Sequence, residues 1–98
     1  MFKDFKDTDL SASAHHLGLL RKGQRATVAG MAESGSADQL ALRRRLMELG
    51  FVPGEPIQVV AESFPGGDPI AVRLGNTTFA LRRHEAAMVR TTAPQDHE

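Results

Sequence analysis

The most regular hydrophobic pattern in the chain begins directly after Ser36. At about 100° per residue, Leu42, Leu46 and Leu49 fall on one face, which predicts an amphipathic helix packed against a core. Ser36 and Gln39 have the spacing of a capping box, in which the serine oxygen accepts a backbone N–H and the glutamine reaches back. The pattern therefore predicts a helix with a defined start.

This helix is expected over residues 37–49 and ends at Gly50, because glycine enters the left-handed conformation of a helix end at low cost. Phe51 follows at the apolar position of a Schellman motif and is expected to contact Leu46. Pro53-Gly54 supplies the preset φ and the positive φ of a type II turn. The turn directs the chain into a strand.

Alternation of apolar and polar residues after this turn predicts a β-rich second half. Gly75-Asn76 fits a two-residue hairpin turn. Strands are expected at 26–32, 56–63, 70–74, 77–81 and 87–91, with a short helical turn at 83–86. The side chains expected to fill the interior are Ile57, Val59, Ile70, Val72, Leu74, Phe79, Leu81 and Val89, with Ala61 on the same face of its strand as Ile57 and Val59. Short strands with tight turns and one helix predict a mainly β fold, a small closed or nearly closed barrel of about five strands.

The composition fits one soluble domain with one small core. Of the 98 residues, 41% are hydrophobic and 24% charged. The expected domain spans 17–91, between a flexible arm at 1–16 and a mobile tail at 92–98. The chain lacks cysteine, which excludes disulfides and thiolate metal sites. It contains no secretory signal and no apolar run of about 20 residues, so we expect a cytoplasmic protein without direct membrane insertion.

Several motifs in order resemble the FeoA family, the small cytosolic accessory proteins of bacterial ferrous-iron uptake. The resemblance covers 17–91 and is carried by these residues: Leu17…Leu20…Gly23, Arg45-Leu46…Leu49-Gly50-Phe51…Pro53-Gly54, Ile57…Val59, Gly67-Asp68-Pro69-Ile70 and Leu81-Arg82-Arg83…Glu85-Ala86. It implies an SH3-like β-barrel with one α-helix inserted after the first strand. It also implies a partner, the membrane transporter FeoB, which carries a GTP-binding cytosolic domain.

A second interpretation follows from the same resemblance. Similar domains form the C-terminus of metalloregulators of the diphtheria-toxin-repressor type, which implies a metal-binding or metal-sensing domain. Such regulators need a DNA-binding helix-turn-helix, for which residues 1–16 are too short.

Other function classes lack their residues in this sequence. Gly66-Gly67 has neither the GxxxxGK[ST] context nor a following helix, so no phosphate loop is expected. No serine lies in a GxSxG elbow, and we expect no enzymatic activity. Without Trp or Tyr, the aromatic groove that binds polyproline helices cannot form. Residues 17–90 carry ten basic and seven acidic side chains, a net +3, too little for a nucleic-acid partner.

Four residues are weak candidates for metal binding: His15, His16, His84 and Glu85. Ferrous iron and zinc accept imidazole and carboxylate ligands. His15 and His16 are adjacent, so regular structure would point them apart, although a flexible arm allows them to share a metal weakly. We expect no required cofactor and at most weak Fe²⁺ or Zn²⁺ binding.

The outward face of the expected helix is the candidate partner-binding surface. With Leu40 at 0°, Met47 falls near 340°, Arg44 near 40° and Arg43 near 300°, at about 100° per residue. Leu42, Leu46 and Leu49 occupy the opposite face. Scattered exposed apolar residues are common. As a cluster, however, Leu40, Arg43, Arg44 and Met47 fit contact with an acidic partner, either the iron transporter's cytosolic domain or a second copy of this chain.

Overall fold

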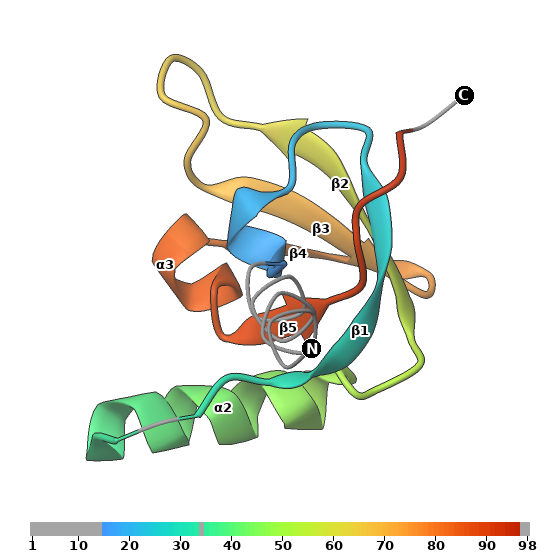
Figure 1. The fold of residues 1–98 in the computed structure, drawn as a ribbon. Helices are drawn as coiled ribbons and strands as arrows, with labels where there is room; N and C mark the ends of the chain where they lie inside the picture. Colours follow the sequence, from blue (N-terminus) through green and yellow to red (C-terminus); the bar gives the residue numbers. More distant parts are fainter. Residues whose placement is uncertain (1–14, 34, 97–98) are drawn as a thin grey trace, which may run out of the picture.

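A computed structural model describes residues 15–33 and 35–96 of the chain (Figure 1). The arm expected at 1–16 therefore lies almost entirely outside the described residues. The elements in chain order are the 3₁₀ helix η1 (Leu17–Leu19), β1 (Arg25–Met31), α2 (Ala37–Leu49), β2 (Pro56–Glu62), β3 (Ile70–Leu74), β4 (Thr77–Leu81), α3 (Arg83–Ala86) and β5 (Val89–Thr91). None of the helices in this part of the chain is long and apolar enough to cross a membrane.

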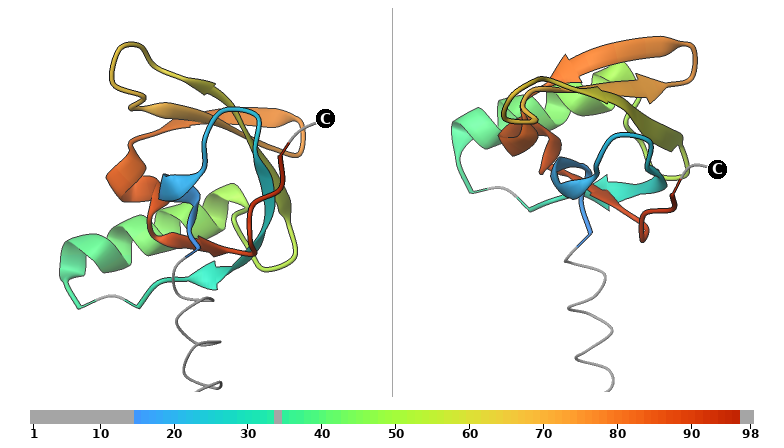
Figure 2. Two further views of the ribbon diagram at one scale, coloured as in Figure 1. Left: turned by 45° about the horizontal axis from the view of Figure 1, so that its top comes forward. Right: turned by 90° about the horizontal axis from the view of Figure 1, so that it is seen from above.

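The strands form one antiparallel sheet in the order β4-β3-β2-β1-β5 (Figures 1 and 2). This is the expected mainly β architecture, with α2 inserted after the first strand. In the described residues the sheet has two edge strands, β4 and β5. In the chain, α3 connects these two strands. Figure 1 shows α2 lying across one end of the sheet.

The two ends of α2 form as the sequence predicts. Ser36 Oγ accepts the N–H of Gln39 at 3.1 Å, and the Gln39 side chain accepts the N–H of Gly35 at 3.3 Å. Gly50 has φ 115°, and the N–H of Phe51 donates to the carbonyl of Leu46 at 3.1 Å. This is the hydrogen bond of a Schellman motif.

Apolar side chains from every strand form one core. Phe51 is fully buried, and its ring lies 5.7 Å from that of Phe79. Val72 and Val59 are also fully buried, as the alternation predicts. Phe79 is only half-buried, because it lies on the edge strand β4. The buried hydrophobic residues are Leu17, Leu20, Ala26, Val28, Leu46, Phe51, Ile57, Val59, Ile70, Val72, Leu74, Leu81, Ala86, Met88 and Val89.

Two of the expected core positions are wrong. Ala61 is exposed because the pairing of β2 with β3 shifts between Val59 and Ala61, where a bulge reverses the alternation. Leu49 is 36% exposed. It is the last residue of α2, and the chain turns at Gly50, so that Phe51 enters the core in its place.

Pairing extends beyond both expected limits of the domain, 17 and 91. His16 forms an isolated bridge with Arg90, and the N–H of Thr91 donates to the carbonyl of His15. At the other end, Arg25 and Gln95 exchange two backbone hydrogen bonds, of 2.8 and 2.7 Å. The described residues of the expected tail, 92–96, thus continue along β1.

Candidate docking surface

The outward face of α2 carries the four residues predicted to contact a partner: Leu40, Arg43, Arg44 and Met47. We call them the α2 surface. Leu40 is 51% and Met47 44% exposed. They reach solvent because α2 packs on the core through Leu46, which is buried, and Leu42, which is half-buried. The structure therefore leaves both apolar side chains of the α2 surface uncovered.

The two arginines of the α2 surface differ in burial. Arg44 is exposed, whereas Arg43 is half-buried and its Nε has no hydrogen-bond partner among the described residues. The two ion pairs between described residues both involve the carboxylate of Glu62. Neither arginine thus forms an ion pair with a described carboxylate, and both contribute positive charge to the α2 surface.

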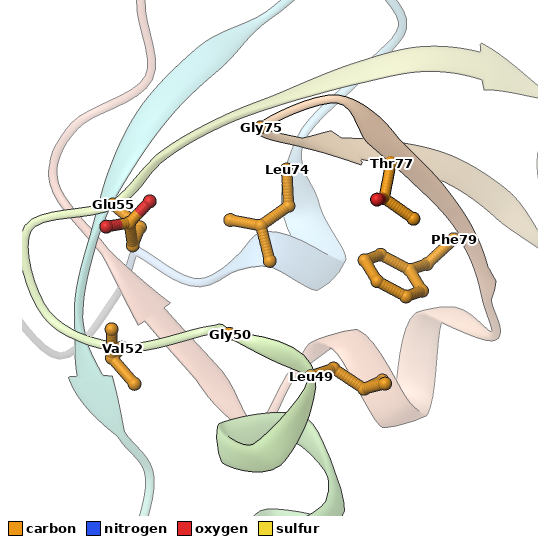
Figure 3. Close-up of a pocket in the computed structure, with 8 residues that line it drawn as sticks. All are labelled: Leu49, Gly50, Val52, Glu55, Leu74, Gly75, Thr77 and Phe79. Atoms are coloured by element: carbon orange, nitrogen blue, oxygen red, sulfur yellow. The ribbon is translucent and has the colours of Figure 1, made fainter.

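A groove of about 350 Å³ lies between the end of α2 and the hairpin of β3 and β4 (Figure 3). Leu49 faces Phe79 across it. Val52, 37% exposed, adds a further apolar group. The lining residues are Leu49, Gly50, Val52, Glu55, Leu74, Gly75, Thr77 and Phe79. One signal for this groove is present in the sequence, Leu49 directly before the helix-ending glycine, but the helical pattern places Leu49 on the core face.

The predicted metal candidates lie around η1, α3 and β5. His16 pairs with β5, and its Nδ1 is buried without a hydrogen-bond partner in the described residues. Burial lowers the pKa of the His16 imidazole. His84 is exposed, and Glu85 Oε1 accepts the N–H of Arg82 at 2.9 Å, which caps α3. Within the described ranges, no three His, Asp or Glu side chains are grouped to hold a metal ion.

A cluster of charged groups that sequence reasoning missed joins η1, β2 and α3. The Arg83 guanidinium donates to three carbonyls, those of Gly67 at 2.8 Å, Gly18 at 2.9 Å and Leu20 at 2.8 Å. Its Nη2 lies 3.6 Å from Glu62 Oε2. The sequence predicts only a short helical turn at Arg83. It gives no sign of these contacts, because their partners are separated from Arg83 by as many as 65 positions.

Glu62 is the acidic centre of this cluster. Its carboxylate accepts the backbone N–H of Lys22 and the guanidinium of Arg21, at 3.1 Å from Nε to Oε2. The hydrogen bond from Lys22, together with Arg21 and Arg83, holds the pKa of the Glu62 carboxyl below its usual value. These contacts hold η1, β2 and α3 together, so we assign the cluster a structural role.

Comparison with known proteins decides the family. The family model for the FeoA domain matches residues 15–92. The chain belongs to the FeoA family. A search of functionally curated proteins returned no match.

Solved structures agree with this assignment. The zinc complex of Stenotrophomonas maltophilia FeoA, described as a prokaryotic SH3 domain protein, is 37% identical, with a TM-score of 0.75 over 87% of this chain and 100% of that one. A FeoA-like protein from Clostridium acetobutylicum is 27% identical, with a TM-score of 0.70 over 86% of this chain and 91% of that one.

The fold also occurs in metalloregulators. A manganese-dependent transcriptional repressor is 20% identical and has a TM-score of 0.65 over 80% of this FeoA chain and 40% of the repressor. At this identity the likeness concerns the fold alone.

Proposed function

We propose that this FeoA protein is a non-enzymatic accessory protein of bacterial ferrous-iron uptake that acts in the cytoplasm on the FeoB transporter. Its membership of the FeoA family associates it with ferrous-iron transport. The phosphate-loop and nucleophile-elbow motifs are missing from its sequence. Its contribution is therefore contact with the transporter rather than chemistry of its own.

The main support for a docking site comes from the exposed side chains of the α2 surface. Leu40 and Met47 are exposed beside arginines that no described carboxylate pairs with. Exposed leucine and methionine supply buried area on contact, and arginine is favoured at protein interfaces. In our proposal, the α2 surface docks on an acidic patch of the transporter's GTP-binding cytosolic domain.

A binding titration of the full chain against the transporter's purified cytosolic domain, with and without GTP, tests this proposal. The double variant Leu40→Ser, Met47→Ser is expected to bind at least about tenfold more weakly, since two apolar contacts are lost. A matched control, Leu19→Ser, removes an exposed leucine from η1 and should bind as the wild type does. Undiminished binding by the double variant would exclude the α2 surface.

A second candidate function, transition-metal binding, is supported by one observation on a relative. The FeoA of Stenotrophomonas maltophilia was solved as a zinc complex. In this chain His16, with its unpartnered Nδ1, is the side chain best suited to take part. Anaerobic calorimetry with Fe²⁺ distinguishes sensing from docking. Stoichiometric sub-micromolar binding that is lost on replacing His15, His16 and His84 would favour a sensor, whereas heat at the level of buffer would reject it.

A further inference from the structure

The strand β4 has one side that no described residue pairs with. It is the edge strand of the sheet, and it pairs with β3 alone. Leu74 and Thr77 are cross-strand partners on either side of the two-residue turn. The pair that flanks such a turn is hydrogen-bonded, and hydrogen-bonded pairs then alternate with non-hydrogen-bonded pairs along the two strands. Thr78 and Ala80 therefore point their N–H and C=O groups away from β3, towards the open edge. Figure 2 shows β4 at the rim of the sheet.

The groove between α2 and the β3–β4 hairpin runs beside this edge on the inner side of the strand. Thr77 and Phe79 line it from β4, Leu49 lies opposite Phe79 at the end of α2, and Val52 lies at the far side near Glu55 (Figure 3). Strand residues alternate between the two faces of a sheet. A strand added to β4 would consequently place every second side chain over the groove and the others over the opposite face. The one charged residue of the groove, Glu55, lies on the side away from Phe79 (Figure 3). The part next to β4, between Leu49 and Phe79, therefore favours apolar side chains for the first set.

The opposite face selects acidic side chains for the second set. Arg73 is the cross-strand partner of Thr78 and is exposed on this face. Arg82 follows the last residue of β4 and is also exposed. The ion pairs formed within 15–33 and 35–96 involve neither arginine. An added strand would bring its carboxylates within reach of both guanidinium groups.

We propose that the open edge of β4 and the groove beside it bind an extended segment of a partner protein, in which apolar residues alternate with acidic ones. The main-chain hydrogen bonds are made by Thr78 and Ala80, the apolar side chains fill the groove, and the carboxylates meet Arg73 and Arg82. This is recognition by strand addition, in which backbone pairing supplies affinity and alternate side chains supply specificity. The site is separate from the α2 surface.

Amide NMR of the full chain, titrated with a blocked eight-residue peptide of alternating Val and Glu, tests the proposal. The N–H signals of Thr78 and Ala80 should shift more than those of β5, the other edge strand, and should saturate. A peptide of the same composition with its four Val preceding its four Glu should bind at least tenfold more weakly, and one of alternating Val and Lys should not bind. Equal binding of the three peptides would overturn the proposal.

Variants at one position separate backbone pairing from other contacts. Ala80→Pro removes an outward N–H that β3 does not use and should weaken the binding of the Val-Glu peptide at least tenfold, while Ala80→Ser keeps the N–H and should stay within twofold of the wild type. Should Ala80→Pro fold poorly, Leu49→Ser at the exposed groove rim should weaken binding at least threefold. Binding unaffected in these variants would overturn strand addition.

The free protein offers a further test of whether the edge is available. The N–H groups of Thr78 and Ala80 should exchange rapidly with solvent. Slow exchange at all concentrations would mean that another segment of this chain covers the edge, and protection that rises with concentration would mean that a second copy does. Either result would overturn the proposal without bearing on the α2 surface, which the peptide does not contact.

Discussion

At the scale of single residues, Gly50 occupies a position that only glycine fits readily. Its φ of 115° is one that side-chain-bearing residues rarely adopt, and a Cβ built on it would lie 3.1 Å from Leu74 Cδ2. Because the chain reverses here, Phe51 enters the core and Leu49 is left at its rim. The turn at Gly50 thus places Phe51 in the core and Leu49 at the groove beside β4.

Replacing Gly50 with valine is expected to lower the free energy of unfolding by at least about 1 kcal/mol, because a β-branched residue resists positive φ. Urea denaturation measures the change. Gly35→Val is the matched control, since a Cβ there has nothing within 4 Å. If the two variants are equally stable, α2 does not depend on Gly50 for its end.

Truncation of Val72 to alanine tests the core. The side chain is fully buried on β3, so the variant is expected to lose roughly 1–3 kcal/mol of stability. Val52→Ala removes the same atoms from a position that is 37% exposed and should cost clearly less. Equal losses in thermal or urea unfolding would contradict the inward orientation of Val72.

At the scale of elements, the sequence predicts those helices and turns whose signals lie in neighbouring residues. The helix at 37–49 and the hairpin turn at Gly75-Asn76 have local signals, and both lie where these predict. The exposure of Ala61 could not be foreseen, because a bulge depends on how two strands pair. The contacts of Arg83 were missed for the same reason, since its carbonyl partners belong to distant segments.

The candidate site likewise has one part that local sequence signals predict and one part that depends on distant segments. Helical spacing alone predicts that Leu40 and Met47 share an exposed face, as the structure has them. The groove beside β4 combines Leu49 with Phe79 from a strand 30 positions later, and only the folded chain brings them together. Whether the α2 surface binds a partner remains a prediction.

Arg83 holds three elements together, and its removal should be costly. Arg83→Ala leaves the carbonyls of Gly18, Leu20 and Gly67 without their donor, and we expect a loss of about 2–4 kcal/mol of stability. Arg44→Ala, at an exposed arginine, is the control and should change stability by less than about 0.5 kcal/mol. Comparable urea midpoints for the two variants would show that the cluster around Arg83 contributes little.

At the scale of the whole molecule, Glu62 links stability to pH. Its pKa is lower in the folded than in the unfolded state, so its contribution is present above the unfolded pKa of about 4.3 and is lost as pH falls through the folded value. Glu62→Gln should therefore be less stable than the wild type at neutral pH, with the difference shrinking in acid. A difference in urea midpoint that is constant from neutral to acid pH would contradict the ion-paired state of Glu62.

The whole molecule presents two candidate contact surfaces of different character. The core and the cluster around Arg83 stabilise the sheet, α2 presents exposed apolar and basic side chains, and the edge of β4 presents backbone groups that no described residue pairs with. The two outward surfaces lie on different elements, so that each can be altered without unfolding the domain. We propose that the protein functions by contact with a transporter through the α2 surface.

Ferrous-iron uptake by cells that depend on this protein is a direct test of docking through the α2 surface. The variant Leu40→Ser, Arg43→Glu, Arg44→Glu, Met47→Ser should lower the initial rate of radiolabelled Fe²⁺ uptake towards that of cells without the protein, while its circular dichroism spectrum stays that of the wild type. Leu19→Ser, Arg25→Glu alters one exposed leucine and one exposed arginine elsewhere and should support full uptake. Wild-type uptake by the four-residue variant, at equal protein level, would contradict the account.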